Sequence, residues 1–206
     1  MKIKGLNAII DNSIRPDLSN IELAKRVLAG GSRVLQLRGK GLSSKELLRQ
    51  SREIGLLARK AGSLFIVNDR ADIALLSNAD GVHLGQDDLP IAEARKILGK
   101  GRVIGLSTHD LEQALKAEQE GADYIGFGPV FKTETKAGAE EAKGLQALRE
   151  VKKSVNIPVV AIGGINLENL KEVIDTGTDC AAVISAILKA DDIEGATRKF
   201  LEAFQI

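Results

Sequence analysis

Residues 64–89 read LFIVNDRADIALLSNADGVHLGQDDL. Two short aliphatic runs, Leu64–Val67 and Gly81–Leu84, enclose a segment near residues 70–77 whose apolar residues recur at helical spacing. Short runs of this kind are typical of parallel strands that are buried on both faces. The stretch therefore predicts a strand–helix–strand unit, with polar residues directly after each strand.

The same alternation extends along the whole chain. Strands are predicted at Asn7–Ile10, Arg33–Leu37, Leu64–Val67, Gly81–Leu84, Val103–Leu106, Tyr124–Phe127, Pro158–Ile162 and Ala181–Ile184. Helices are predicted at roughly 19–29, 44–61, 70–77, 90–98, 110–119, 144–153, 166–175 and 191–204. Asp110 is a candidate helix N-cap, and glycines are expected at five helix ends, Gly30, Gly62, Gly99, Gly121 and Gly177.

Eight units of this kind can bury their strands in an open doubly wound sheet or in a closed barrel. No helix doublet and no missing helix is apparent, so the pattern favours an α/β fold of the (β/α)₈ TIM-barrel class. No linker rich in Pro or Ser interrupts the 206 residues. We therefore expect a single TIM-barrel domain over residues 1–206.

Composition argues against several classes of protein. Lys and Arg number 29 and Asp and Glu 28, so the formal net charge of +1 does not suit an electrostatic nucleic-acid binder. No apolar run approaches the roughly 18 residues of a membrane span, and Asp11 and Asn12 interrupt any signal-peptide-like start. The single cysteine, Cys180, fits core packing in a reducing compartment. These features predict a cytoplasmic protein without nucleic-acid or membrane partners, and they leave a homo-oligomer open.

Polar residues gather where the predicted strands end, which in a barrel is the catalytic face. Alternation places Gln36, Arg38 and Lys40 on one side of a strand end, where an amide and two cations can hold a polyanion. A glycine pair at 163–164 and Ser185 follow the last two strands, the usual phosphate site of such barrels. The glycine pair has a second interpretation, a plain turn into the next helix.

Three aspartates at neighbouring strand ends, Asp69, Asp87 and Asp88, offer the hard oxygen ligands that Mg²⁺ prefers. Alternatively, aspartates at these positions cap the helices that follow. We favour a Mg²⁺ role for Asp69 and Asp88, and capping or solvent exposure for Asp87. With cations at the neighbouring strand ends, the arrangement predicts a substrate that carries a metal-bound diphosphate.

The two histidines, His83 and His109, have no second histidine or cysteine at metal-ligand spacing, and no Ser–His–acid order stands out. We therefore expect structural or supporting roles for both, and a helix-start ion pair for Arg70. The longest predicted loop, Gly128–Lys143, is polar and lies between a strand and its helix. A long loop inside a compact barrel is more often a functional lid than slack.

Taken together, the strand ends resemble those of the thiamine-phosphate synthase family, barrel enzymes that join the pyrimidine and thiazole halves of thiamine. The matching stretches are QLRGK (36–40), FIVNDR (65–70), ADGVHLGQDDL (79–89), IGLSTH (104–109), DYIGFGPVF (123–131), TETK (133–136), VVAIGGI (159–165) and VISAI (183–187). The resemblance spans nearly the whole chain. It implies that hydroxymethylpyrimidine diphosphate loses diphosphate to leave a pyrimidine cation. The nitrogen of the thiazole phosphate then attacks this cation, which yields thiamine phosphate.

The resemblance also implies a role for each motif. Mg²⁺ would be held by Asp69 and Asp88. The pyrimidine diphosphate would contact Gln36, Arg38, Lys40, Asn68, Ser107 and Lys136. The thiazole phosphate would contact Thr133, Thr135, Gly164, Ile184 and Ser185. Catalysis would consist of neutralising the charge of the departing diphosphate, with Arg38, Lys40 and Lys136 as the catalytic residues.

Two stretches depart from the family pattern, and three other functions compete. The first strand reads Asn7-Ala8-Ile9-Ile10 where an aromatic residue and a threonine are usual, and Gly39 stands where aspartate is common. A thiazole tautomerase shares the barrel and the phosphate site but needs no complete diphosphate site, and a phosphate-ligand sensor has no use for metal carboxylates. A Schiff-base aldolase needs a lysine at the end of a central inward-facing strand, where this sequence places none. The retained cations and carboxylates favour the synthase.

Overall fold

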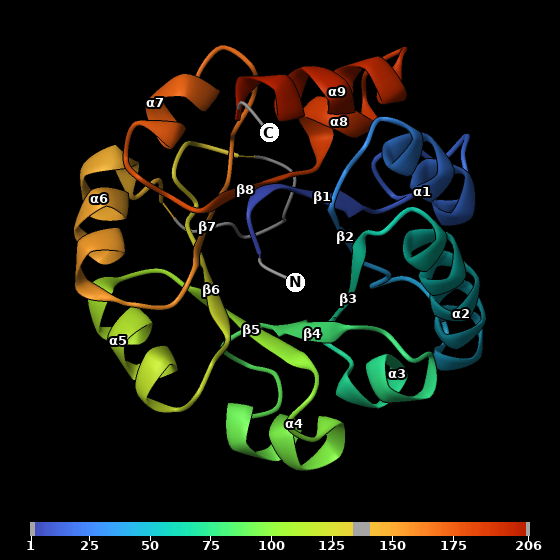
Figure 1. Ribbon diagram of the computed structural model, residues 1–206, viewed down its shortest axis with the longest axis horizontal. Coiled ribbons are helices and arrows are strands. Elements are labelled where there is room, and N and C mark those ends of the chain that lie inside the picture. The colour runs from blue at the N-terminus through green and yellow to red at the C-terminus, as the bar shows by residue number, and fades with distance from the viewer. Residues whose placement is uncertain (1–2, 134–140, 205–206) are drawn as a thin grey trace.

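The computed structural model describes residues 3–133 and 141–204, and its strands form a closed barrel. Each strand pairs in parallel with the next along the chain, and β8 pairs with β1 to close the ring (Figure 1). The strands are β1 (Gly5–Ile10), β2 (Val34–Leu37), β3 (Leu64–Asn68), β4 (Gly81–Leu84), β5 (Val103–Thr108), β6 (Tyr124–Phe127), β7 (Val159–Ile162) and β8 (Cys180–Val183). The predicted TIM barrel is confirmed.

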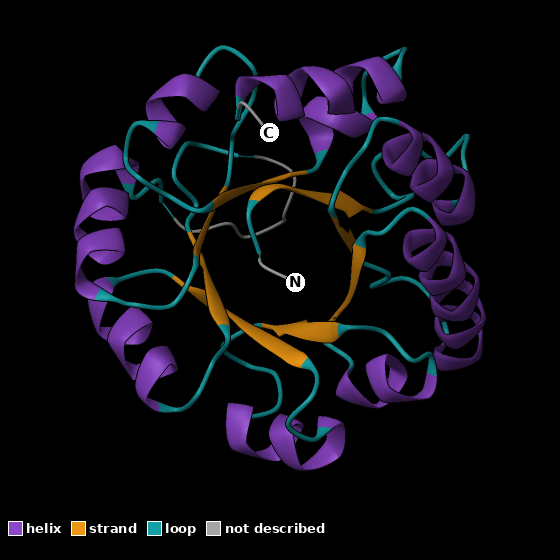
Figure 2. Cartoon of the chain, viewed as in Figure 1, coloured by secondary structure: helices purple, strands orange, loops and turns teal. Residues whose placement is uncertain are grey.

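Helices form a ring around the outside of the barrel (Figure 2). They are α1 (Asn20–Ala29), α2 (Ser44–Lys60), α3 (Ala71–Leu76), α4 (Ile91–Leu98), α5 (Leu111–Gln119), α6 (Gly144–Ser154), α7 (Leu170–Ile174), α8 (Ser185–Leu188) and α9 (Ile193–Ala203). Within the described ranges, none of these helices is long and apolar enough to cross a membrane.

Apolar contacts hold the barrel from two sides. Outward-facing strand residues such as Leu35 and Val67 are fully buried against helix residues such as Leu23 and Ile54. The barrel interior is filled by a second cluster, made of Ile3, Ile9, Val34, Leu64, Ile66, Tyr124, Val160, Cys180 and Ala182. Because both strand faces are largely dry, the strands are mainly aliphatic, and only a few polar side chains such as Asn7 and Gln36 lie within them.

The chain after β7 and β8 differs from the predicted helices. A short helix, α8, follows β8 before α9 begins, so the expected absence of a helix doublet was wrong. At four residues, α8 is too short to show helical periodicity. The helix predicted at 166–175 is confined to α7, because Asn166 and Asn169 form a side-chain-bonded turn instead. Asn169 Oδ1 accepts from Asn166 N, and Asn166 Oδ1 accepts from Glu168 N, each at 2.9 Å.

The glycine prediction for α1 was also wrong in one detail. Gly30 has a right-handed φ of −70°, and its neighbour Gly31 takes the left-handed conformation with φ 92°. Gly30 is needed for a different reason, since a Cβ there would lie 2.6 Å from Thr197 Cβ of α9. The other four predicted helix-end glycines do have positive φ. Asp110 caps α5 as predicted, and it accepts from Gln113 N at 2.8 Å.

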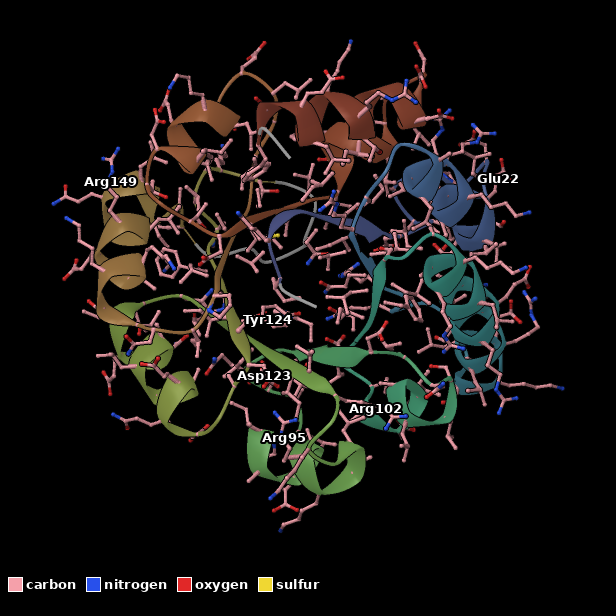
Figure 3. The ribbon with its side chains drawn as sticks, in the orientation of Figure 1. Glu22, Arg95, Arg102, Asp123, Tyr124 and Arg149 are labelled. Atoms are coloured by element: carbon pink, nitrogen blue, oxygen red, sulfur yellow. The ribbon has the colours of Figure 1, made fainter. Side chains whose placement is uncertain are left out.

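Aspartates secure the strands at the end of the barrel opposite their carboxyl ends. Asp80, Asp123 and Asp179 directly precede β4, β6 and β8. Each accepts a hydrogen bond from the start of the preceding strand, at Phe65 N (2.8 Å), Ile104 N (2.7 Å) and Val159 N (2.9 Å). Asp123 also pairs with Arg95 at 2.6 Å (Figure 3). This face therefore has a structural role, which leaves the carboxyl ends of the strands available for chemistry.

Tyr124 projects into the barrel and is packed against Gly105 of β5 (Figure 3). A Cβ on Gly105 would overlap the Tyr124 ring, which is 1% exposed. We expect Gly105→Ala to lower the free energy of unfolding by about 2–3 kcal/mol through overpacking, measured by urea denaturation. Gly101→Ala is the matched control, because nothing lies within 4 Å of a Cβ there. Equal stability of the two variants would contradict this account of the interior.

Candidate active site

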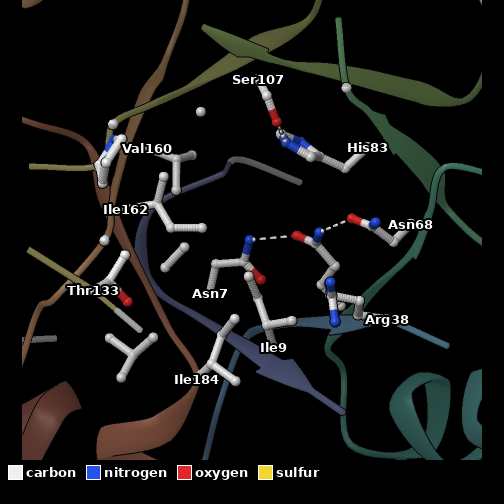
Figure 4. Close-up of a pocket in the computed structure, with 18 of the residues that line it drawn as sticks. Asn7, Ile9, Arg38, Asn68, His83, Ser107, Thr133, Val160, Ile162 and Ile184 are labelled. Carbon is white, nitrogen blue, oxygen red and sulfur yellow. Dashed lines mark hydrogen bonds between the residues drawn. The ribbon is translucent and has the colours of Figure 1, made fainter. Parts of the chain in front are cut away.

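One pocket of about 670 Å³ opens at the carboxyl ends of the strands (Figure 4). It brings together all of the predicted site residues that the structure describes. These are Gln36, Arg38, Lys40, Asn68, Asp69, Asp88, Ser107, Thr133, Gly164, Ile184 and Ser185. Two other predicted residues, Thr135 and Lys136, lie outside the described residues. Residues 134–140 of the predicted loop over Gly128–Lys143 fall in the same gap.

Two cations lie at the β2 side of the pocket. Arg38 Nη1 donates to Asp11 Oδ2 in a close ion pair, and Asp11 is only 4% exposed. The Asp11 carboxylate is itself fixed, since Oδ1 accepts from Ser13 N at 2.9 Å. Lys40 is more open to solvent, and its Nζ lies 3.9 Å from Asp69 Oδ2. The pocket therefore presents one guanidinium of fixed orientation and one more exposed ammonium to an anionic ligand.

Two carboxylates, Asp69 and Asp88, face each other beside these cations. Asp69 has a positive φ of 64° after β3, and its N–H donates to His83 O at 2.7 Å. Burial raises the pKa of Asp69, the negative charge of Asp88 raises it further, and Lys40 opposes both effects. Asp88 Oδ2 accepts from Gly85 N at 2.6 Å, which fixes its position. A cation bound between the two carboxylates would reduce the repulsion between their negative charges.

The structure also bears on the expectations for three other residues, Asp87, Arg70 and Cys180. Asp87 is exposed at the pocket edge, and α4 begins only after Pro90, so solvent exposure rather than capping describes it. Arg70 pairs with Asp72 at 2.6 Å at the start of α3, as predicted. Cys180 is a fully buried free thiol, and burial raises its pKa. It belongs to the core, as expected.

A chain of amides crosses the pocket floor from β1 to β3. Asn7 Nδ2 donates to Gln36 Oε1 at 2.9 Å, and Gln36 Nε2 donates to Asn68 Oδ1 at 2.7 Å (Figure 4). Asn68 Nδ2 then donates to Asp69 Oδ1 at 2.5 Å. Three adjacent strands are thus connected through side chains that end on a carboxylate. The amide groups of Gln36 and Asn68 cannot rotate without breaking this chain.

His83 joins the opposite side of the pocket. Its Nδ1 lies 2.9 Å from the Tyr124 hydroxyl and its Nε2 lies 3.0 Å from Ser107 Oγ. Burial lowers the pKa of His83 to about 4, so the imidazole is neutral at pH 7. Burial also raises the pKa of Tyr124, which stays a hydroxyl. The histidine therefore supports Ser107 as a neutral hydrogen-bond partner, in agreement with its predicted supporting role.

The lowered pKa of His83 predicts acid sensitivity. Between about pH 4 and pH 6.5 the unfolded chain binds this proton and the folded chain does not, so stability rises with pH across that window. We expect the gain to reach about 3 kcal/mol at pH 7 and to be missing in His83→Gln. Urea denaturation at pH 4.5 and 7 measures the difference between wild type and variant, in which the contribution of Asp69 cancels. Parallel pH profiles would rule this out.

The glycines after β7 line the pocket and also allow the segment after β6 to approach closely. Gly163 and Gly164 line the pocket and have φ of 102° and 65°. Each also makes room for the segment after β6, since a Cβ on Gly163 would lie 2.5 Å from Pro129 Cα and one on Gly164 2.6 Å from Lys132 O. Backbone bonds join the two segments, with Phe131 N donating to Gly163 O at 3.0 Å. The glycines therefore bring two loops close together at the pocket wall.

Some pocket residues were not predicted from sequence. Asn7, Tyr124 and His109 lie in the pocket wall or floor, and Asp11 lies beside Arg38. Asp11 follows β1 directly, so the strand-end rule applied to the other strands could have found it. Asn7 and Tyr124 had no such signal, because both lie inside apolar strands. His109 Nδ1 lies 2.6 Å from Gly128 O and joins the loops after β5 and β6.

Comparisons with known proteins agree along the whole chain. A family model described as thiamine monophosphate synthase matches residues 6–187. A thiamine-phosphate synthase of Methanocella arvoryzae is 50% identical over 193 residues, 94% of this chain and 91% of the relative. One of Shouchella clausii is 45% identical over 205 residues, 100% of this chain and 98% of the relative. The solved thiamine phosphate pyrophosphorylase from Pyrococcus furiosus has a TM-score of 0.90 at 41% identity, covering 98% of this chain and 95% of that one.

Proposed function

The chain belongs to the thiamine monophosphate synthase family, and from this premise we infer that it is a transferase that forms thiamine phosphate. It condenses hydroxymethylpyrimidine diphosphate with the thiazole phosphate and releases diphosphate. One observation carries this conclusion. A single pocket holds cations and paired carboxylates at β2–β4 and a glycine-lined wall at β7–β8, which supports the binding of two phosphorylated substrates in one site.

Diphosphate leaves from a carbon whose positive charge the aminopyrimidine ring stabilises, so the protein needs no nucleophile. What it must supply is compensation for the charge that develops on the leaving group. We assign this role to Arg38 and Lys40, which line the pocket, and to Lys136 on the basis of its motif. Holding the thiazole nitrogen next to the cation then favours attack by proximity alone.

The remaining contacts divide between the two substrates. The pyrimidine diphosphate is assigned to Gln36 and Asn68, which lie on the neighbouring strands β2 and β3 beside the cations, and to Ser107 on β5. The thiazole phosphate is assigned to the opposite wall. Its proposed contacts are Thr133, Thr135, Gly164, Ile184 and Ser185. Support for this division is the position of each described residue in the pocket, with the two groups on opposite sides.

We assign Mg²⁺ to Asp69 and Asp88. The two carboxylates fit a divalent cation, because they are close enough for one to raise the pKa of the other. No group of three or more His, Cys, Asp or Glu ligands occurs within the described ranges. Mg²⁺ needs only one or two carboxylates when phosphate oxygens and waters complete its shell. When bound, the ion would neutralise charge on the diphosphate.

Two features of the chain, its buried thiol and its net charge, bear on its location and partners. A buried free thiol at Cys180 and a near-neutral net charge support a cytoplasmic enzyme without a nucleic-acid partner. We propose this location, with small molecules as the substrates. A homo-oligomer is compatible with the chain, and sedimentation would establish the oligomeric state.

Product formation tests the function directly. The purified protein is mixed with both substrates and Mg²⁺, with and without EDTA, and thiamine phosphate and diphosphate are quantified. We expect both products in equal amounts, and their loss with EDTA. Thiazole tautomerisation without thiamine phosphate would replace the synthase by the tautomerase. Product formation that is insensitive to EDTA would remove the metal and leave the synthase in place.

A further inference from the structure

Asn7 has a feature that the proposed reaction leaves unexplained. It lies within β1 and is 2% exposed, and most of the other residues of this strand are apolar. In the part of the chain that the structure describes, only two buried side-chain oxygens have no hydrogen-bond partner, Asn7 Oδ1 and Ser51 Oγ. An unpaired buried acceptor destabilises the folded state. We therefore expect Asn7 to have a function in the pocket that offsets this destabilisation.

The reason lies in the direction of the amide chain. An ionised carboxylate only accepts, so Asn68 must turn its Nδ2 toward Asp69 and its Oδ1 toward Gln36. Gln36 must then donate through Nε2, which leaves Oε1 to accept from the next residue. At that position a donor is required, and Asn7 Nδ2 provides it. The unpaired Asn7 Oδ1 is what remains at the end of a chain whose polarity is set by Asp69.

Gln36 is the residue whose amide orientation is fixed from both sides by these hydrogen bonds. Its Nε2 and Oε1 are each used once, and each keeps one further hydrogen or lone pair. The side chain lines the pocket on the side assigned to the pyrimidine diphosphate. An amide fixed in one orientation matches a ring edge that carries one donor and one acceptor side by side, as an aminopyrimidine does. If the amide rotated by half a turn, the match would be lost.

We propose that Asn7 is a positioning residue that fixes the Gln36 amide and thereby selects the aminopyrimidine substrate. The proposal rests on the proposed function, because it deepens the recognition of one of its two substrates. Asn7 lies in the pocket floor, and in this proposal it acts on the substrate through its hydrogen bond to Gln36. Its effect should therefore fall on the pyrimidine diphosphate and spare the thiazole phosphate.

Two substitutions test the role of Asn7 in different ways. Asn7→Leu has similar size, removes the unpaired oxygen and frees Gln36 Oε1. Asn7→Asp keeps the shape but places a carboxylate against Gln36 Oε1, so the amide must turn and oppose Asn68 Oδ1. We expect Asn7→Leu to raise the KM for the pyrimidine diphosphate about 5- to 10-fold, and Asn7→Asp about 30-fold or more, because it reverses the chain rather than interrupting it. The KM for the thiazole phosphate should stay within about twofold.

Ser51→Ala is the matched control, because it removes the other unpaired buried oxygen from α2, away from the pocket. Both KM values should be unchanged in this variant. A double-mutant cycle gives the second readout. If Asn7 acts through Gln36, then Asn7→Leu combined with Gln36→Leu has the same KM as Gln36→Leu alone. Additive effects, or equal increases in KM for both substrates, would overturn the positioning role.

Calorimetric binding of the pyrimidine diphosphate in the presence of Mg²⁺ separates this inference from the function itself. A wild-type protein that neither binds this ligand nor forms product would contradict both the proposed function and the positioning role of Asn7. If the wild type forms product but both Asn7 variants bind the pyrimidine diphosphate as tightly as the wild type does, the positioning role of Asn7 is contradicted and the proposed function is not. If Asn7→Leu fails to fold, the similar shape of Asn7→Asp keeps the comparison available.

Discussion

Asp69→Asn is expected to lower kcat by about 10³-fold while leaving the affinity for the thiazole phosphate within about twofold. Asparagine is the informative replacement because it tolerates the φ of 64° at this position and can still accept from Asn68 Nδ2. The change therefore removes one negative charge and little else. Steady-state kinetics with both substrates measures the loss, and calorimetry measures binding of each ligand.

The physical reason for this size of effect is the pairing of Asp69 with Asp88. Burial and the charge of Asp88 raise the pKa of Asp69, so the site is electrostatically unfavourable until a cation enters it. Without one carboxylate, the Mg²⁺ that we propose at this site, and the diphosphate with it, would be held less tightly. Asp72→Asn is the matched control, since this exposed carboxylate pairs with Arg70 outside the pocket. Equal loss of thiazole phosphate binding in Asp69→Asn would make Asp69 a structural residue.

The fold was largely predictable because its signal is local. Each buried parallel strand is a short aliphatic run, so β2, β4 and β6 were placed within one residue of their observed bounds. The errors occur where short-range hydrogen bonds replace periodicity. Asn166 and Asn169 shorten the helix after β7 in this way. Helix α8 has too few residues to show a repeat of 3.6.

The site was predictable only to the extent that its residues end strands. Arg38 and Asp69 directly follow β2 and β3, and Asp88 lies in the turn after β4, so topology alone brings them to one face. Contacts across strands were not predictable, because they depend on register. Asn7 is opposite Val34 in the β1–β2 ladder, and this offset places its side chain next to Gln36. A polar residue inside an apolar strand nevertheless deserves a search for partners on the neighbouring strands.

Arg38→Lys is expected to reduce kcat/KM for the pyrimidine diphosphate by about 10²-fold, almost as much as Arg38→Gln, although it keeps the positive charge. The reason is the buried Asp11. A guanidinium can donate to Asp11 through Nη1 and still turn its other N–H groups to a phosphate, whereas Asp11 would hold the single ammonium of a lysine.

Arg198→Gln on α9 is the control for this substitution, because Arg198 forms an exposed pair with Glu194 away from the pocket and its loss should change nothing in the kinetics. Combining Asp11→Asn with Arg38→Lys then separates charge from geometry. With Asp11 neutral, the lysine ammonium is released toward the substrate, so the double variant should recover part of the activity that Arg38→Lys loses. If Arg38→Lys alone retains wild-type kcat/KM, the diphosphate requires only a positive charge at this position. In that case the fixed arrangement of the guanidinium N–H groups does not contribute to the reaction.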